Sequence, residues 1–384
     1  MIPYSTQSIS NQDISAVTKI LKSRLITQGK VVQIFEKTLA KKVGAKYAVS
    51  ANSATSALHM ACLALGLSKK DYLWTSSNSF VASANCGRFC GANIDFVDID
   101  KDTWNISVDS LEKKLIKAKK NKKLPKIIVI VHFAGQPAEM EKIHKLKIKY
   151  GFKIIEDASH ALGAKIGKKA IGNCFYSEIS VFSFHPVKSM TTAEGGMALT
   201  NSLKLEEKLR LFGNHGITRD LKMMKKKLNK PWYYEQIKLG FNYRMNELQA
   251  ALGLSQLKRL DLFIKKRNLI AKQYKKAFKN SNIQFQKIKK NYYSSYHLFV
   301  IKILEIDKFK YDRIFNLLRK KKLGVNLHYL PIHKQPYYSK LKNYDNLTVS
   351  EDYAKTAFSI PIYYDLNKKK LNYAIKVIKT ILAS

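Results

Sequence analysis

One lysine among many is surrounded by residues suited to carbonyl chemistry. Lys188 lies in the stretch FSFHPVKSMTTAEGG, residues 182–196, together with Pro186 and the pair Gly195-Gly196. A lysine amine must be neutral to attack a carbonyl carbon, but a free lysine with a pKa of ~10.4 is neutral in only about one molecule in 10³ at pH 7. Burial and nearby positive charge lower that pKa. Because the proline predicts a turn and the glycines allow a close backbone approach, the stretch predicts a lysine that holds an aldehyde cofactor such as pyridoxal phosphate.

A carboxylate and a helix start are the next candidates. Asp157 ends the apolar run GFKIIED, where a predicted strand ends, and ligands of open α/β sheets gather at such carboxyl ends. The alternative for Asp157 is a cap for a following helix. The segment NSATSALHMA, residues 52–61, predicts a helix whose first N–H groups are open to a phosphate, or else a plain capped core helix. The absence of GxGxxG after the first strand and of GxxxxGK[ST] disfavours nicotinamide and P-loop sites.

Short apolar runs alternate with helical patterns and predict the scaffold that positions these residues. The predicted strands are residues 47–51, 72–76, 93–99, 126–131, 153–157, 179–184 and 197–201, and the predicted helices between them are residues 55–65, 81–90, 108–119 and 140–150. This order predicts a largely parallel α/β sheet covered on both faces. Ser10 and Asp13 have the spacing of a capping box at the start of an early helix. A long helix starting near Asn246 leads into a smaller α+β unit, so we expect a large domain of residues 1–255 and a small domain of residues 256–384.

Charge and cysteine content narrow the class of protein. The 384-residue chain has a formal net charge of +41, but its basic runs at residues 117–123, 224–230, 265–268 and 320–323 are separated by apolar segments. We interpret these lysines as solvated faces and expect no nucleic-acid partner. The four cysteines show no CxxC pair and no zinc spacing, which predicts no metal site and a reduced, cytoplasmic protein, with Cys86 and Cys90 on one buried helix face. We find no secretory signal and no apolar run of the ~20 residues that a spanning helix needs, so we expect no membrane partner.

The stretch around Lys188 resembles the active-site signature of the fold-type I, pyridoxal-phosphate sugar aminotransferases of the DegT/StrS group. Other segments resemble the same family in the same order, from about residue 4 to residue 361: LITQG, NSATSAL, SNSFVASANC, EDASHALGA, GFNYRMNELQAALGLSQLKRLD and VNLHYLPI. Within the family, Tyr4, RLITQG, PWYYEQIKLGFNYRMNE and the spelling NSATSAL are most similar to the aminotransferases of pseudaminic acid synthesis. The resemblance implies a large domain with a mostly parallel mixed sheet sandwiched by helices, followed by a smaller C-terminal α+β domain.

The resemblance also implies roles for the residues that would face the cofactor ring. Lys188 is expected to hold pyridoxal phosphate covalently and later to shuttle the proton. Asp157 is expected to pair with the pyridinium nitrogen, so that the ring can act as an electron sink. His160 is expected beside the ring. Phe80 is expected to stack on it, with simple core packing as the alternative.

Other matching residues are expected around the cofactor phosphate. The backbone of Ala54 and Thr55 and the hydroxyl of Ser183 are expected to hold it. Asn242 is expected to reach the same phosphate from the partner subunit of a homodimer, which makes each active site a product of two chains. The alternative for Asn242 is a turn residue, and the alternative for Arg244, two residues later, is a surface ion pair.

A final set of residues matches the substrate-contacting segments of the family: Tyr4, Arg24, Leu25, Ile26, Thr27, Asn326, Leu327, His328 and Tyr329. Of these, His328 can equally be a loop histidine whose hydrogen bonds are satisfied locally.

The resemblance implies transfer of an amino group from L-glutamate to C4 of a UDP-linked 4-keto-6-deoxy-N-acetylhexosamine, UDP-2-acetamido-2,6-dideoxy-β-L-arabino-hex-4-ulose, in pseudaminic acid biosynthesis. One alternative is another nucleotide-sugar 3- or 4-aminotransferase, of the perosamine or aminoarabinose type. Another is a regulator that binds pyridoxal phosphate without turnover, against which the lysine, the aspartate and the asparagine motif count. Some relatives carry histidine in place of the lysine and dehydrate sugars, so Lys188 favours transamination.

Overall fold

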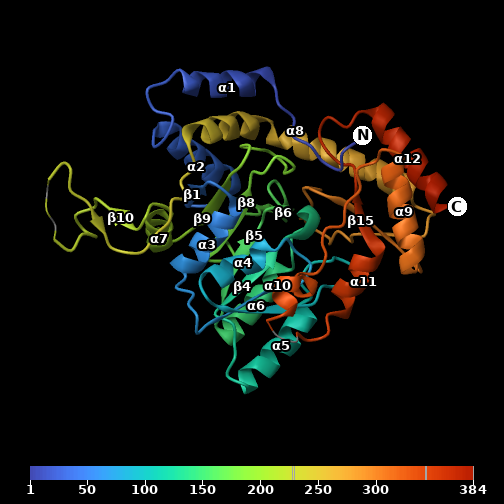
Figure 1. Cartoon of the computed structure of the whole chain (residues 1–384), viewed down its shortest axis with the longest axis horizontal. Helices are drawn as coiled ribbons and strands as arrows, with labels where there is room; N and C mark the ends of the chain where they lie inside the picture. Colours follow the sequence, from blue (N-terminus) through green and yellow to red (C-terminus); the bar gives the residue numbers. More distant parts are fainter. Residues whose placement is uncertain (227, 229, 342–343, 384) are drawn as a thin grey trace.

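A seven-stranded sheet forms the centre of the computed structural model, which describes residues 1–226, 228, 230–341 and 344–383 (Figure 1). Its order is β1-β9-β8-β5-β4-β2-β3. The strands are β1 (Tyr47–Ala51), β2 (Tyr72–Ser76), β3 (Asn93–Val97), β4 (Ile127–Val131), β5 (Lys153–Asp157), β8 (Ile179–Ser183) and β9 (Gly196–Thr200). Strand β9 runs antiparallel to β1 and β8, and the other neighbours are parallel. The prediction of a largely parallel sheet is confirmed, with strand ends within two residues of those predicted.

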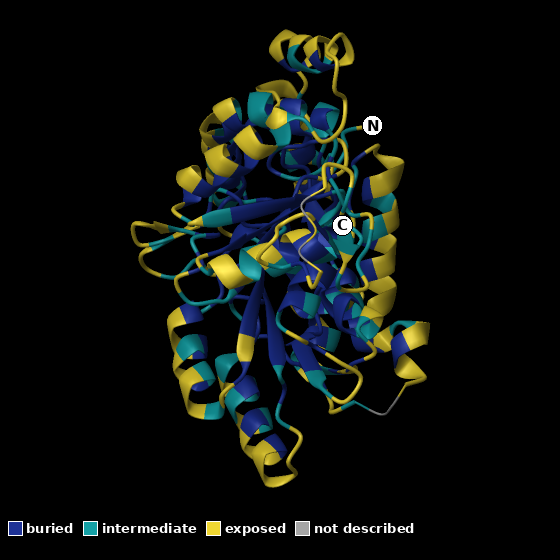
Figure 2. Cartoon of the chain, turned by 90° about the vertical axis from the view of Figure 1, so that its left-hand side faces the viewer, coloured by how far each residue is buried: buried dark blue, intermediate teal, exposed yellow. Residues whose placement is uncertain are grey.

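Helices cover both faces of this sheet, as the apolar strands require. In β4, Ile127 and Val129 pack into one hydrophobic cluster, whereas Ile128 and Ile130 pack into another on the opposite face. The helices on the first face are α3 (Ala54–Ala64), α4 (Ala82–Phe89) and α7 (Leu203–Gly213). Those on the second face are α5 (Val108–Lys120), α6 (Met140–Tyr150), α2 (Lys30–Val43) and α8 (Glu247–Ala277). Figure 2 shows the result, a buried sheet between helices whose outer sides are exposed.

Helix α1 (Asn11–Leu21) lies along α8, as Figure 1 shows. The predicted capping box is present, because Ser10 accepts from the Asp13 amide and Asp13 accepts from the Ser10 amide. The Asp13 carboxylate is fully buried, where it also accepts hydrogen bonds from Gln256, at 2.8 Å, and from Arg259 on α8. These bonds compensate for the loss of water around the carboxylate and dock α1 against α8.

The C-terminal unit has a core of its own. Its three-stranded antiparallel sheet has the order β12-β14-β15, and its elements are β12 (Ile283–Phe285), β14 (Phe299–Ile303), β15 (Ala357–Ile360), α9 (Lys308–Lys320), α11 (Thr348–Thr356) and α12 (Lys368–Leu382). Ile270 and Tyr274 of α8 belong to its hydrophobic cluster, and Ile2 pairs with Leu323 beside it. Helix α8 therefore runs without a break through the predicted boundary after residue 255, and the division into 1–255 and 256–384 stays a prediction.

Short elements connect these units: β6 (Lys165–Ile166), β7 (Lys169–Ala170), β10 (Ile217–Thr218), β11 (Glu235–Gln236), β13 (Tyr292–Tyr293), α10 (Pro336–Ser339) and the 3₁₀ turns η1 (Phe133–Gly135) and η2 (Ile332–Lys334). Two residues of the predicted basic run 224–230, Lys227 and Asn229, lie outside the described residues. Among the residues that are described, no helix combines the length and the apolar composition needed to cross a membrane.

Glu247, at the start of α8, supports a test of how the N-terminal helices are held. Its buried carboxylate accepts the amides of Gly29, Val31 and Val32 at 2.9, 2.7 and 3.4 Å, and so caps α2. We expect Glu247→Ala to lower the stability by about 1–3 kcal/mol, because buried N–H groups lose their acceptor. The measurement is the thermal midpoint of unfolding. Glu207→Ala, at an exposed position of α7, is the control, and equal midpoints for the two variants would contradict this account.

Candidate active site

The predicted carboxylate lies where expected, at the carboxyl end of a central parallel strand. Asp157 ends β5 and is 5% exposed. Its Oδ2 accepts a hydrogen bond from the Ser83 hydroxyl at 2.6 Å, and its Oδ1 accepts the Ser159 amide at 3.1 Å. Ser83 in turn lies 2.7 Å from the hydroxyl of Ser79. These donors hold a negative charge in one orientation inside the protein, as a partner for a cationic ring nitrogen must be held.

Lys188 lies on the loop between β8 and β9, with a backbone turn bond from its own amide to the carbonyl of His185 at 2.9 Å. Burial lowers the pKa of Lys188 to about 8, although the charge of Asp157 acts in the opposite direction. The amine is therefore neutral in about one molecule in ten at pH 7, far more often than in a free lysine. The two groups singled out from the sequence interact with each other in the folded protein.

The two glycines after this loop bring β9 against the start of α3. A Cβ atom at Gly196 would lie 2.5 Å from the amide nitrogen of Ala54, and one at Gly195 would lie 2.2 Å from the hydroxyl of Thr192. The close approach predicted for the glycine pair is therefore confirmed. Gly196 is also the register partner of Ser183, so that this hydroxyl-bearing residue and the first turn of α3 are neighbours.

The start of α3 has the features of a phosphate cradle. Its N-cap is Ser53, whose hydroxyl accepts the Ser56 amide at 3.1 Å. The first amides of a helix have no acceptor within the helix, and those of Ala54 and Thr55 belong to partly exposed residues. Together with the helix dipole, they suit an anion. The donors at α3, the carboxylate of Asp157 and the desolvated lysine fit the phosphate, ring nitrogen and aldehyde of pyridoxal phosphate.

Phe80, just before α4, is 56% exposed, so core packing does not account for it. Its ring centroid lies 6.1 Å from that of Tyr329. The Tyr329 hydroxyl lies 3.1 Å from Nε2 of His160. Because Nδ1 of His160 accepts the Ala134 amide at 3.3 Å, a neutral His160 carries its proton on Nε2 and donates to Tyr329. Phe80, Tyr329 and His160 thus form one aromatic wall.

Histidines near Lys188 are held in the neutral form. Burial, followed by the charge of Lys188, lowers the pKa of His160 and brings that of His328 to about 3. His328 hydrogen-bonds through Nδ1 to Ser359 at 2.8 Å and lies 3.4 Å from the amide of Asn326. The alternative for His328, a loop histidine with local partners, therefore describes its contacts. Its ring is also 5.0 Å from that of Tyr4, another predicted substrate residue.

The remaining predicted residues lie elsewhere. Arg24, Leu25, Ile26 and Thr27 occupy the loop between α1 and α2, where Leu25 and Ile26 are about half exposed. Leu327 packs at the edge of the hydrophobic cluster around Phe133. Their contact with substrate stays a prediction.

Asn242 lies close to the start of α3 of its own chain through its backbone. Its carbonyl accepts the Asn52 side-chain amide at 3.4 Å, while its own side chain is exposed. The next residue but one, Arg244, donates to the Asn214 side chain at 2.6 Å rather than forming the alternative ion pair. The contact of Asn242 with a partner's phosphate stays a prediction.

Ser83 and His297 are site residues that sequence reasoning did not single out. Ser83 lies within SNSFVASANC, four residues after Ser79, and one helical turn is what brings the two hydroxyls together. His297 follows Tyr296 in the segment before β14, and its ring centroid lies 4.4 Å from that of His160. Nothing local marks either residue, because both meet the site through long-range packing.

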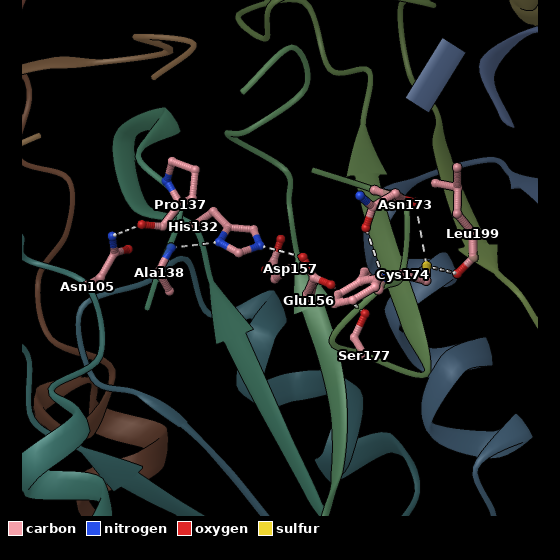
Figure 3. A network of polar contacts seen from close by, with 12 residues as sticks. Asn105, His132, Pro137, Ala138, Glu156, Asp157, Asn173, Cys174, Ser177 and Leu199 are labelled. Atoms are coloured by element: carbon pink, nitrogen blue, oxygen red, sulfur yellow. Dashed lines mark hydrogen bonds and ion pairs between the residues drawn. The ribbon is translucent and has the colours of Figure 1, made fainter. Parts of the chain in front are cut away.

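The opposite side of the same strand end is fixed by a second polar network, drawn in Figure 3. The buried carboxylate of Glu156 lies 2.8 Å from Nε2 of His132 and accepts the Ser177 hydroxyl. Since Nδ1 of His132 accepts the Ala138 amide at 3.0 Å, Nε2 carries the proton that is donated to Glu156. The His132 amide also donates to the carbonyl of Asp157 at 3.2 Å, so the network anchors the backbone that carries Asp157.

Comparison with known proteins agrees with this geometry. The DegT/DnrJ/EryC1/StrS aminotransferase family model matches residues 7–379. A Campylobacter jejuni UDP-4-amino-4,6-dideoxy-N-acetyl-beta-L-altrosamine transaminase is 39% identical over 383 residues, which cover 100% of this chain and 98% of the relative.

Two solved structures have the same fold. Helicobacter pylori PseC, an aminotransferase of pseudoaminic acid biosynthesis, superposes with a TM-score of 0.90 at 33% identity, covering 100% of this chain and 99% of its own. The PLP form of the sugar aminotransferase Spr1654 of Streptococcus pneumoniae superposes with a TM-score of 0.89 at 25% identity, covering 100% and 98%. The chain therefore belongs to the DegT/DnrJ/EryC1/StrS family of sugar aminotransferases, which depend on pyridoxal phosphate.

Proposed function

We propose that this sugar aminotransferase moves an amino group from L-glutamate to C4 of UDP-2-acetamido-2,6-dideoxy-β-L-arabino-hex-4-ulose, a step of pseudaminic acid biosynthesis, in the reducing cytoplasm. The observation that carries the chemistry is the pairing of a desolvated Lys188 with the buried Asp157 beside the first turn of α3. The full-length identity of 39% to an altrosamine transaminase supports the choice of sugar.

Bound pyridoxal phosphate supplies an aldehyde that accepts the amino group and a ring that withdraws electrons. The chain contributes the proton chemistry. Lys188, with a pKa of about 8, can both remove and return a proton near neutral pH, as a general acid–base group must. Asp157, held by Ser83, presents a fixed negative charge to the ring nitrogen. The amides of Ala54 and Thr55 hold the phosphate end.

The neutral aromatic wall is assigned to orientation rather than to charge. His160 donates to the Tyr329 oxygen, and burial raises the pKa of Tyr329, so that this hydroxyl stays protonated. A protonated, oriented hydroxyl can donate to an oxygen of the cofactor or of the sugar. Tyr4 and His328 lie at the same wall and are assigned to the sugar.

We also propose a homodimer with shared active sites. The arm that contains β10 and β11 extends from the body of the chain in Figure 1. It exposes three large apolar residues, Trp232, Tyr234 and Leu239, at 69%, 51% and 79%. Apolar surface of this kind favours association with another chain. The arm leads directly to Asn242, which supports delivery of this side chain to a second copy.

The pKa of Lys188 gives a pH dependence for cofactor capture. The neutral amine attacks the aldehyde, and a pKa lowered to about 8 makes the neutral form predominant above that pH. We expect the rate at which apoprotein captures pyridoxal phosphate to rise with pH and to level off above about pH 8. Stopped-flow absorbance measures this rate. An inflection near pH 10, the value of a free lysine, would show that the amine is not desolvated.

A panel of sugars tests the substrate. We expect mass spectrometry to show an aminated product from the UDP-linked 4-keto-6-deoxy-N-acetylhexosamine with glutamate, and weaker or no product from dTDP-linked 4-keto sugars. Lys188→Ala is expected to lose turnover, because the proton carrier and covalent anchor are removed, while retaining loose cofactor binding. Amination of non-UDP sugars alone would refute the substrate, and near-normal turnover by Lys188→Ala would refute the mechanism.

Complementation tests the shared site. Asn242→Ala is expected to lower kcat/KM about 10–150-fold, the cost of a hydrogen bond to a charged group. Mixed with Lys188→Ala under conditions of subunit exchange, it should regain about a quarter of wild-type activity, because half of the dimers then contain one intact site. Separate variants that are inactive and stay inactive after mixing, despite exchange shown by native mass spectrometry, would place Asn242 in its own chain's site.

A further inference from the structure

Three cysteines and a histidine meet where α3 packs against α4, outside the groups used for catalysis. Cys62 is on α3, Cys86 is on α4, and Cys90 caps the end of α4. The Cys62 thiol is hydrogen-bonded with both other cysteines. The expectation that Cys86 and Cys90 share one face of a helix is confirmed, with the difference that Cys90 is partly exposed and Cys86 is fully buried.

The surroundings make Cys90 the reactive member of this cluster. The hydrogen bond from Cys62 is the largest cause that lowers the pKa of Cys90 to about 6, and contact with His59 acts in the same direction. Burial raises the pKa of Cys62. The thiolate is the form that reacts with oxidants. The partly exposed Cys90 is therefore the nucleophile, and Cys62 is the buried thiol beside it.

His59 is oriented for this task. Its Nδ1 lies 3.1 Å from the hydroxyl of Tyr243, whose own pKa is raised by burial and by the nearby Cys90. A protonated tyrosine can donate to Nδ1, which leaves the proton of His59 on Nε2, the nitrogen available to the sulfur. The rings of Phe89 and Phe241 pack against His59 at centroid distances of 5.3 and 4.8 Å and fix its position.

We propose that Cys90 and Cys62 form a reversible thiol–disulfide pair that responds to hydrogen peroxide. In the first step the Cys90 thiolate attacks a peroxide oxygen, the O–O bond breaks, and hydroxide leaves, giving a sulfenic acid. In the second step the Cys62 sulfur attacks the Cys90 sulfur, the S–O bond breaks, and water leaves with the Cys62 proton. The two sulfurs lose two electrons in total, and peroxide takes them up.

The pair joins the two helices that carry the cofactor groups. Helix α3 begins with the proposed phosphate cradle at Ala54, and α4 carries Ser83, the donor to Asp157. The carbonyl of Ser83 itself accepts the Cys86 thiol at 3.3 Å. A disulfide draws the two sulfurs to ~2.05 Å, closer than thiols in hydrogen-bond contact, and so pulls α3 and α4 together. This consequence rests on the proposed cofactor site: oxidation is expected to weaken the hold on pyridoxal phosphate.

Peptide mapping tests the bond itself. Trypsin places Cys62, Cys86 and Cys90 in three different peptides, residues 47–69, 71–88 and 89–101, so each linkage is distinguishable. The wild-type holoprotein treated with hydrogen peroxide is expected to lose two of its four thiols, to yield the 47–69/89–101 linked peptide, and to recover the thiols with dithiothreitol. Oxidation of Cys90 to a sulfinic acid without a linked peptide, or linkage through Cys86, overturns the proposal.

Serine variants provide the matched controls. Cys90→Ser and Cys62→Ser should yield no linked peptide, whereas Cys86→Ser, between them in sequence, should still yield the Cys62–Cys90 link. Circular dichroism checks that each variant is folded. Should a variant fail to fold, the wild-type mapping decides alone.

The rate of pyridoxal phosphate release to an external scavenger tests the consequence. Oxidised wild type should release the cofactor faster than reduced wild type, and peroxide-treated Cys90→Ser should match its untreated form. Equal rates in crosslinked and reduced wild type overturn the regulatory role. Borohydride reduction followed by peptide mapping separates this failure from another: a pyridoxyl group elsewhere than on Lys188 refutes the proposed function, while the crosslink result stands independently.

Discussion

A buried carboxylate next to a desolvated amine sets the terms for the rest of this structure. Removing Asp157 from water is costly unless hydrogen bonds replace the lost solvation. Ser83 and the Ser159 amide supply these bonds, one to each oxygen. Lys188 loses its own solvation nearby, which lowers its pKa to about 8 despite the attraction of Asp157. The balance between these two effects keeps the lysine close to the point where it can both accept and give a proton.

The position of Asp157 depends on what happens on the other side of its strand. Successive side chains of β5 point to opposite faces, so Glu156 is directed away from the site that Asp157 faces. The hydrogen bonds from His132 and Ser177 stabilise that second buried carboxylate (Figure 3). Because His132 also donates to the Asp157 carbonyl, side chain and backbone at this strand end are fixed together. A displacement of Glu156 would therefore be transmitted to the carboxylate that faces the cofactor.

Much of the fold and part of the site could be predicted from local patterns. Apolar runs such as IIVIV located the strands, and the glycine pair at 195–196 indicated the backbone approach to Ala54. Contacts between distant segments could not be read in the same way. The serine that orients Asp157 lies 74 residues before it, and α8 passes unbroken between the two hydrophobic units because its two halves pack on different partners. Such contacts are set by tertiary packing, for which a single sequence has no periodic signal.

The three histidines around the lysine show how charge is confined. Burial lowers the pKa of His160, His297 and His328, and the positive charge of Lys188 lowers each of them further. All three therefore remain neutral at physiological pH, and their hydrogen bonds orient side chains without adding cations. A further cation at this position would favour the neutral lysine but would also weaken the interaction of Asp157 with a cationic ring nitrogen. The net charge of +41 can attract an anionic nucleotide sugar from a distance, while the interior keeps Lys188 as the group whose charge changes near pH 8.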